Sequence, residues 1–360
     1  MSQSWRSGQR PLRSVRVLVP GTTGRFRCGG LLVELQTARL LSQFAAVEVV
    51  TYRQRQPEHP FLADLLRDEP TGLGASSPLW LVSWGFDVPW LLRRLKGRPT
   101  AYHAHSSGYG FDLPAGVPVV AVSRNTLGYW GDRAPRNPLL LVPNALEPMW
   151  LERGARGSQE QRPIDVLVQR RKSSAYVLDQ LVPALRARGL RVEVQSGWVD
   201  DLADLFNSAT VVVYDSAPYW RGRGVSEGFG LPPIEALACG CVVFSSLNHA
   251  LADNLDPGVV GHQLGAGTLE TDLARIEAAA RAPADWQPQH AALEALLKAS
   301  CESVLIQRWA QALKQINAHW DQLDQGARPL ENPAQWKLRL QLSCRSIGSL
   351  AGRLLRLRRA

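Results

Sequence analysis

The chain has 360 residues, of which 45% are hydrophobic and 20% charged, and it carries a formal net charge of +9. This composition is typical of a globular protein with sizeable buried cores, and the length suits two domains better than one. Five scattered cysteines without a C-x-x-C pair argue against a disulfide framework and a zinc site. The sequence has neither an apolar run of the roughly 18 to 20 residues that a membrane-spanning helix needs nor the apolar core of a secretory signal, so we expect a cytoplasmic protein.

A glycine-rich loop follows the first predicted strand. Residues 1–14 are polar and basic and are expected to form a loosely attached arm. An apolar run at residues 15–19 predicts a strand, and the helix predicted at residues 31–44 begins directly after Gly29 and Gly30. Strand, glycine-rich loop and helix occur in this order in nucleotide-binding folds, although the loop has neither a G-x-G-x-x-G fingerprint nor a P-loop lysine.

Five further apolar runs predict the remaining strands of a first domain, residues 15–155. They lie at residues 47–51, 79–83, 100–103, 119–122 and 139–142, with helices predicted between several of them, such as 61–67 and 88–96. Strands that alternate with helices imply a parallel sheet covered on both faces, and ligands bind such sheets beyond the carboxyl ends of the strands.

A polar stretch at residues 151–163 separates these elements from a second set. Strands are predicted at residues 164–168, 191–195, 210–214 and 241–244, and helices at 175–188, 202–207, 269–281 and 291–323. We expect residues 156–325 to form a second domain and residues 326–360 to form a basic tail. The fold class is therefore α/β, with a Rossmann-like, doubly wound parallel sheet in each domain.

The most informative stretch is EGFGLPPIEALACG, residues 227–240, which lies between two predicted strands. Glu227 and Glu235 have seven residues between them, and two prolines place a helix start just before Glu235. We expect Glu235 in the first turn of this helix and Gly240 at its end. The glycine turn then presents N–H groups at a helix N-terminus, which favours phosphate. A Glu in a first turn is also favourable through the helix dipole alone, and Gly-x-Gly turns are common.

This segment closely resembles the E-x7-E signature of the family 4 retaining glycosyltransferases, which have the two-domain GT-B architecture. The resemblance implies that the two Rossmann-like domains face a cleft. In that family the first Glu holds the hydroxyls of the donor sugar and the second holds the ribose of the sugar nucleotide, which assigns these roles to Glu227 and Glu235. The glycine turn lies against the diphosphate, and the matching positions are Gly228, Phe229, Gly230 and Leu231.

The resemblance extends to the first domain. The family carries a Gly-Gly near the donor phosphate and the acceptor, and Gly29 and Gly30 match it. It also carries a His before Ser or Thr, directed at the donor sugar, and His105 with its two following serines matches this pattern. His103 faces the same side of the strand if the strand continues, and we interpret it as structural. A metal held by this pair has no third ligand in view, so no metal site is expected.

Three adjacent cations, Arg170, Arg171 and Lys172, follow the strand predicted at residues 164–168. The family carries an Arg and a Lys at this strand end, normally several residues apart. The resemblance implies that Lys172 and either Arg171 or Arg170 meet the diphosphate, whereas a short charge run taken alone is more often a solvated loop.

Two segments depart from the family pattern. The loop at residues 215–226 is longer than the family norm, and it is either an acceptor-binding loop, a lid or a local insertion. Residues 245–253 replace the Gly-Gly and Glu that the family usually has after this strand.

The sequence thus predicts a retaining glycosyltransferase, of the hexosyltransferase type, that moves a sugar from a nucleotide-sugar donor to a glycan or lipid-linked acceptor. His105, Lys172, Arg171 and Glu227 are the candidate catalytic residues. Because cations and a helix N-terminus would stabilise the diphosphate, we expect neither a metal nor another cofactor. The alternatives are a sugar-nucleotide enzyme that does not transfer, such as an epimerase, and an inactive fold that binds a glycan or a partner protein.

The tail is strongly basic. Residues 333–360 contain seven basic residues and no acidic one, so they account for seven of the nine net positive charges. Cations alternate with Leu, Ile and Trp336, from which we predict a basic amphipathic helix on the anionic inner face of a membrane. A solvated helix and a nucleic-acid contact are the alternatives, and we expect no nucleic-acid partner because no recognised motif accompanies the charge.

Overall fold

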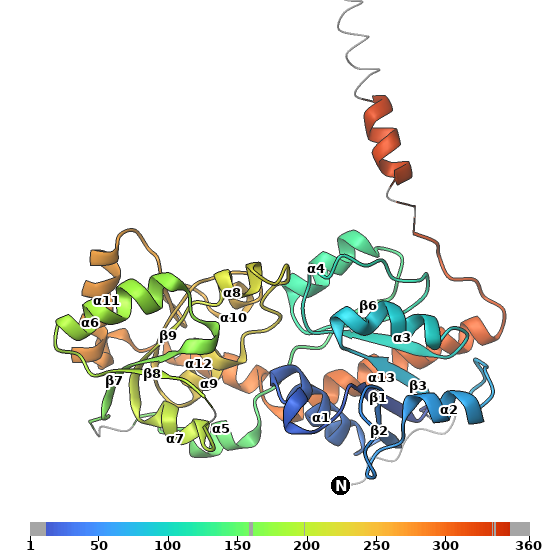
Figure 1. Ribbon diagram of the computed structural model, residues 1–360, viewed down its shortest axis with the longest axis horizontal. Helices are drawn as coiled ribbons and strands as arrows, with labels where there is room; N and C mark the ends of the chain where they lie inside the picture. Colours follow the sequence, from blue (N-terminus) through green and yellow to red (C-terminus); the bar gives the residue numbers. More distant parts are fainter. Residues whose placement is uncertain (1–11, 158–160, 198, 333, 335, 346–360) are drawn as a thin grey trace, which may run out of the picture.

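Two parallel sheets organise the chain, and they lie side by side in Figure 1. The computed structural model describes residues 12–157, 161–197, 199–332, 334 and 336–345. The first sheet has six strands in the order β2-β1-β3-β4-β5-β6, and the second has five in the order β11-β10-β9-β7-β8. Every pairing between these strands is parallel. The predicted α/β fold with two Rossmann-like sheets is therefore confirmed.

We call the first sheet and the helices packed on it the first lobe. Its strands are β1 (Val15–Val19), β2 (Val47–Thr51), β3 (Leu79–Val82), β4 (Thr100–Ala104), β5 (Val119–Ala121) and β6 (Leu139–Leu141). Its helices are α1 (Gly29–Leu41), α2 (Leu62–Asp68), α3 (Val88–Arg94) and α4 (Arg124–Arg133), with short 3-10 turns η1 (Gly24–Phe26) and η2 (Gly85–Asp87). Successive strand residues enter opposite cores, as Val17 and Leu18 do, because helices cover both faces of the sheet.

We call the second sheet and its helices the second lobe. Its strands are β7 (Ile164–Gln169), β8 (Val192–Gln195), β9 (Ala209–Tyr214), β10 (Val242–Ser245) and β11 (His262–Gln263). Its α-helices are α5 (Pro148–Arg153), α6 (Val182–Ala187), α7 (Leu202–Asn207), α8 (Ala217–Arg221), α9 (Leu231–Ala238), α10 (Leu251–Asn254), α11 (Leu269–Arg281) and α12 (His290–Ala299). The shorter turns are η3 (Arg170–Lys172), the π-helix η4 (Tyr176–Leu181) and η5 (Pro283–Trp286).

Two predicted helices differ from the structure. The helix predicted at residues 175–188 starts as the π-helix η4 and becomes α-helical only at α6, where Pro183 removes one N–H and crowds the carbonyl one turn earlier. The helix predicted at residues 291–323 is two helices, α12 and α13 (Glu302–Asp324). It breaks at Ser300, whose carbonyl accepts the N–H of Leu146 at 2.8 Å instead of continuing the helical ladder.

Helix α13 crosses back onto the first lobe and runs across the middle of that lobe in Figure 1. Trp309, Leu313 and Ile316 belong to the same core as Val17 of β1 and Leu40 of α1. The fold of the first lobe therefore depends on residues from the far end of the chain.

The basic arm ends earlier than predicted. Residues 1–11 lie outside the described residues, but Arg13 is only 3% exposed. Its guanidinium is 2.6 Å from a carboxylate oxygen of Asp321 on α13 and donates to the carbonyl of Ser77 at 3.2 Å. Burial of a charge requires such partners, so Arg13 is part of the first lobe.

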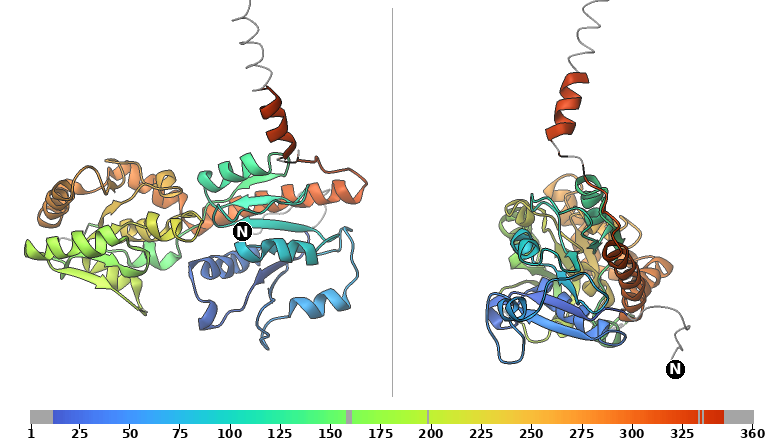
Figure 2. Two further views of the ribbon diagram at one scale, coloured as in Figure 1. Left: turned by 45° about the horizontal axis from the view of Figure 1, so that its top comes forward. Right: turned by 90° about the vertical axis from the view of Figure 1, so that its right-hand side faces the viewer.

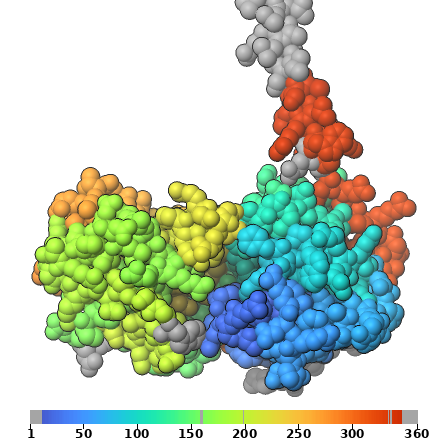
Figure 3. All heavy atoms as spheres, in the orientation of Figure 1, coloured from blue at the N-terminus to red at the C-terminus, as the bar shows by residue number. Residues whose placement is uncertain are grey.

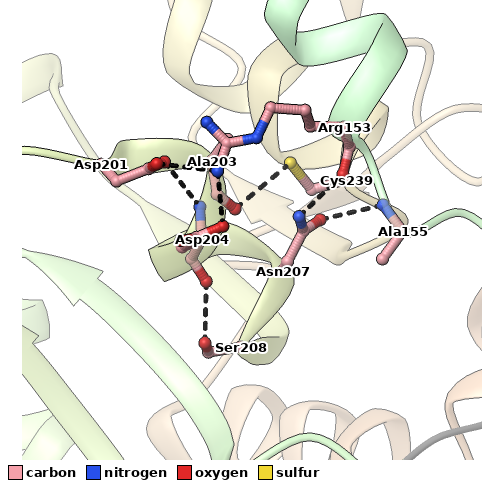
Figure 4. Close-up of polar contacts among 8 residues, drawn as sticks. All are labelled: Arg153, Ala155, Asp201, Ala203, Asp204, Asn207, Ser208 and Cys239. Carbon is pink, nitrogen blue, oxygen red and sulfur yellow. Dashed lines mark hydrogen bonds and ion pairs between the residues drawn. The ribbon is translucent and has the colours of Figure 1, made fainter.

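The segment that leaves α5 is fastened to the second lobe (Figure 4). Arg153 Nη2 lies 2.7 Å from both Asp201 Oδ2 and Asp204 Oδ1. The side chain of Asn207 donates to the carbonyl of Arg153 and accepts the N–H of Ala155, both at 2.9 Å. Residues 153–155 are therefore held to helix α7.

Residues 336–345 form a helix that stands away from both lobes (Figure 2). Its large apolar side chains are exposed, at 61% for Trp336 and 53% for Leu340. With about 100° per helical residue, these two share one side, whereas Leu338 and Leu342 fall on the opposite side. In this part of the tail, large apolar side chains therefore lie on both sides of the helix, and the membrane contact predicted for the tail stays a prediction. Of the helices within the described ranges, none is long and apolar enough to cross a membrane.

Candidate active site between the two lobes

The glycine turn before α9 lies where the two lobes meet. A Cβ atom at Gly228 would be 1.4 Å from the carbonyl oxygen of His105, so the first lobe approaches this turn too closely for any side chain. Gly230 precedes the helix with φ +84°, in the left-handed region that favours glycine. Within the described ranges, the N–H groups of residues 228–231 donate no hydrogen bond to the protein. They are therefore available to an anion at the start of α9.

Glu235 lies one turn further along α9 than the sequence predicts. Helix α9 begins at Leu231, ahead of the two prolines, so Glu235 is its fifth residue and not part of the first turn. Burial raises the pKa of the Glu235 carboxyl to about 8, while the positive charge of Lys172 opposes this shift and the negative charge of Glu147 adds to it. Gly240 ends the helix with φ +77°, as predicted.

Glu227 is buried and held by three side chains. Its Oε2 accepts hydrogen bonds from the hydroxyl of Tyr214 at 2.7 Å and from Nε1 of Trp220 at 2.6 Å. Lys172 Nζ lies 3.9 Å from the other oxygen, Oε1. Burial and the charge of Glu227 raise the pKa of Tyr214 well above its ordinary value, so this phenol stays a proton donor. One carboxylate oxygen is thus occupied by the protein and the other faces a cation.

Trp220 is a site residue that the sequence prediction did not name. It comes from the long loop at residues 215–226, in which the structure forms the short helix α8. Besides its bond to Glu227, its ring lies 5.0 Å from Lys172 Nζ, a cation–π distance. No motif spacing points to Trp220, because its contact depends on how the loop folds.

The three cations after β7 are separated in space. Lys172 is half-buried beside Glu227, whereas Arg170 and Arg171 are exposed. In the part of the chain that the structure describes, neither arginine side chain makes a hydrogen bond or an ion pair. Lys172 is therefore part of the preformed site, and either arginine is free to turn toward an anionic ligand.

His105 shares a buried carboxylate with His103. Glu34 of α1 is fully buried, and its Oε1 lies 2.7 Å from Nδ1 of His103 and 2.5 Å from Nε2 of His105. Burial alone would raise the pKa of Glu34, but the charges and hydrogen bonds of the two histidines outweigh it and lower the pKa to about 2. Burial lowers the pKa of His103 although Glu34 opposes this shift.

The prediction that this histidine pair lacks a third candidate ligand is corrected by Glu34. One ligand atom from each of Glu34, His103 and His105 lies within 4.8 Å of the others. Hydrogen bonds already join the carboxylate to both rings, so an ion would have to displace them. Sequence spacing could not reveal the group, since Glu34 is 71 residues from His105.

A seam of serine hydrogen bonds brings His105 to the glycine turn. The hydroxyl of Ser106 donates to the carbonyl of Ser226 at 2.6 Å, and the N–H of Ser107 donates to the hydroxyl of Ser226 at 3.0 Å. All three serines are buried, and Figure 3 shows the lobes in contact along their facing sides. The candidate residues His105 and Glu227 thus flank one junction between the lobes.

Gly29 and Gly30 open helix α1, one turn before Glu34. Among the described atoms, a Cβ on Gly29 would meet none within 4 Å, and one on Gly30 would meet only Cys28 Sγ, at 3.9 Å. Because Glu34 contacts His105, this end of α1 is directed at the same junction. Backbone approach by a ligand is therefore unobstructed at these two glycines.

Two α/β lobes that face each other across a polar junction are the arrangement found in GT-B glycosyltransferases, and comparison with known proteins agrees. Residues 170–279 match the model of the family described as glycosyl transferases group 1, so the chain contains a group 1 glycosyltransferase domain. No curated protein matches the sequence. The predicted two-lobe GT-B fold is confirmed, and the match over residues 170–279 supports the predicted glycosyltransferase family, while the roles of Glu227 and Glu235 remain predictions.

Solved structures share this fold at low sequence identity. Sucrose-phosphate synthase from Thermosynechococcus elongatus is 16% identical with a TM-score of 0.59, and the match covers 85% of this chain and 99% of that one. Anabaena HepE in complex with UDP-glucose is 15% identical with a TM-score of 0.59, covering 84% and 99%. The lipopolysaccharide outer core galactosyltransferase WaaB is 12% identical with a TM-score of 0.54, covering 84% and 99%.

Proposed function

We propose that this protein is a retaining glycosyltransferase of the hexosyltransferase type, which takes a sugar from a nucleotide-sugar donor and passes it to a glycan or lipid-linked acceptor. One observation carries the proposal: the pair of Glu227 and Lys172 adjoins the free N–H groups that precede α9, with His105 directly across the junction. A hydroxyl-binding carboxylate, a cation and an anion cradle are the groups that a sugar diphosphate requires.

In the proposed complex, Glu235 binds the nucleotide end of the donor. Its raised pKa means that the carboxyl is largely neutral near pH 7, and a neutral carboxyl can both donate to and accept from a ribose diol. HepE was solved with UDP and with UDP-glucose, which supports a nucleotide sugar as the class of donor.

The leaving group is the nucleoside diphosphate. When the bond between the anomeric carbon and the diphosphate oxygen breaks, its electron pair stays on the diphosphate. Lys172, one of the two arginines and the N–H groups of residues 228–231 would meet this charge. Removal of one such preorganised donor commonly costs about 10²- to 10³-fold in rate. Because the chain itself supplies positive charge, we propose that transfer needs no metal ion.

The sugar lies between Glu227 and His105 in the proposed complex. Glu227 Oε2 is already occupied by two donors, so we assign Oε1, which faces Lys172, to a sugar hydroxyl and not to covalent attack. The acceptor hydroxyl then attacks the anomeric carbon from the face that the diphosphate leaves and gives its proton to the departing diphosphate oxygen, so the anomeric configuration is retained. Proton NMR of the first product formed would show this configuration directly.

The tail supplies a second contact in the proposal. Its seven basic residues would be attracted to anionic lipid at about 1 kcal/mol for each residue near the surface. An enzyme bound at the cytoplasmic face of the membrane would meet a lipid-linked acceptor at the membrane surface. The exposed Trp336 and Leu340 would add apolar contact on one side of the helix.

A thermal-shift screen over UDP-, GDP- and ADP-sugars tests the proposal first, because a ligand that binds the folded state raises the unfolding temperature. The stabilising donor is then incubated with the protein, with and without EDTA, and the products are separated. Release of free nucleotide or transfer supports the proposal. Interconverted free donor indicates an epimerase, and no stabilisation by any donor indicates a binding protein.

A further inference from the structure

We propose that Glu34 is a positioning residue, which fixes the tautomer and the ring orientation of His105 so that an unprotonated Nδ1 faces the junction between the lobes. This inference rests on the proposed function, since it assigns His105 a place beside the donor sugar. It extends that function to a residue on α1 that is not among the positions matched to the family's motifs.

Hydrogen-bond chemistry sets the tautomers. An ionised carboxylate can only accept, so each ring nitrogen that faces Glu34 Oε1 must carry a proton. His103 therefore has its proton on Nδ1, and His105 has its proton on Nε2. In the neutral imidazole the second nitrogen of His105 is then an acceptor, suited to a sugar hydroxyl.

Burial shows that the arrangement is held firmly. The side chains of Glu34 and His103 are 0% and 1% exposed, while that of His105 is 17% exposed. His103 Nε2 is buried without a partner among the described residues, and the edge of Trp309 lies against its ring at 5.0 Å between centroids. His103 is thus covered by α13, and His105 is the histidine that reaches the junction between the lobes.

The backbone of His105 is fixed at the same time. Its carbonyl abuts Gly228, and the two following serines bond to Ser226 of the second lobe. Glu34 therefore completes a set of constraints: the second lobe holds the main chain and α1 holds the ring. A carboxylate that orients an imidazole in this way is a recurring device for selecting one tautomer.

The isosteric variant Glu34→Gln separates this role from simple packing. Its amide can donate as well as accept, so His105 is no longer restricted to the Nε2–H tautomer. The protein is labelled with ¹⁵N-histidine, and the ring tautomers are read from long-range proton–nitrogen NMR spectra, with resonances assigned through His103→Asn. We expect Nε2–H for His105 in the natural protein, and Nδ1–H or a mixture in Glu34→Gln.

Donor hydrolysis provides the functional readout. We expect kcat to fall about 10- to 100-fold in Glu34→Gln, the usual effect of losing an orienting partner, with UDP affinity unchanged because the nucleotide lies on the second lobe. An unfolding temperature close to that of the natural protein shows that the variant is folded. The less conservative Glu34→Asp, whose carboxylate is one methylene shorter, should keep the tautomer if it reaches the rings and recover part of kcat.

Three results would overturn the assignment. One is a His105 tautomer that is Nδ1–H in the natural protein, and another is an unchanged kcat in Glu34→Gln. The third is tight 1:1 binding of Zn²⁺ by the natural protein with loss of both ring N–H signals, which would make the cluster a metal site. Failure of every nucleotide sugar to bind would refute the proposed function instead, and the NMR result would still decide the role of Glu34.

Discussion

Replacement of Trp220 by Phe removes one hydrogen bond from Glu227 and leaves most of the packing in place. Trp220 Nε1 donates to Glu227 Oε2 at 2.6 Å, and Tyr214 holds the same oxygen at 2.7 Å. A hydrogen bond to a charged group contributes about 1.5–3 kcal/mol. Because Tyr214 still holds the carboxylate, we expect the lower end of this range, about 1.5 kcal/mol, or roughly tenfold in affinity.

Isothermal titration with the stabilising nucleotide sugar and with its nucleoside diphosphate alone distinguishes the two ends of the site. Trp220→Phe should bind the nucleotide sugar about tenfold more weakly and the nucleoside diphosphate as tightly as the natural protein does, since Glu227 is assigned to the sugar. Tyr219→Phe is the matched control, because Tyr219 is the neighbour of Trp220 on α8 and, among the described residues, the side-chain hydrogen bonds to Glu227 come from Tyr214 and Trp220. An equal loss for the nucleoside diphosphate and the nucleotide sugar, or no loss at all, would refute the role given to Trp220.

Three further predictions follow from the geometry. Because burial raises the pKa of Glu235 from 4.5 to about 8, the folded protein keeps a proton between these pH values that the unfolded chain releases, so the free energy of unfolding falls as pH rises through this window. Without ligand, the unfolding temperature should therefore drop more between pH 5 and 8.5 in the natural protein than in Glu235→Gln. Parallel plots of unfolding temperature against pH for the two proteins would contradict this. Gly228→Ala would place a Cβ 1.4 Å from the carbonyl oxygen of His105, so X-ray scattering should show separated lobes and the rate of donor hydrolysis should fall about 100-fold. Unchanged scattering and an unchanged rate would refute the contact between Gly228 and His105. Deletion of residues 333–360 should abolish sedimentation with anionic vesicles and leave donor hydrolysis intact; sedimentation that persists would exclude the tail as the anchor.

Local patterns predicted most of the elements. Strand β1 and helices α7 and α11 begin and end at the predicted residues, since apolar periodicity and turn residues act over short distances. Helix ends were predicted less well where a distant contact decided them. The helix ends after α12, where the carbonyl of Ser300 accepts the N–H of Leu146. Glu235 falls in a later turn of α9 than predicted because α9 starts ahead of its two prolines.

The site was predictable only in the part that one motif covers. Glu227, Lys172 and His105 converge on the junction as the family resemblance implies, although nothing yet tests their roles. Glu34 and Trp220 could not be found from spacing, because each reaches its partner through the tertiary fold. In the tail, alternation of charged and apolar residues does not specify one apolar face, because a helix places such residues on two sides.

The central claim is that Lys172 stabilises the diphosphate as it leaves a sugar held by Glu227. The most direct measurement is the rate at which purified protein releases nucleotide from its stabilising donor, compared between the natural protein and Lys172→Ala. We predict measurable release by the natural protein and a rate about 100-fold lower in the variant, with nucleotide affinity changed much less. Equal rates in the two proteins would contradict the account.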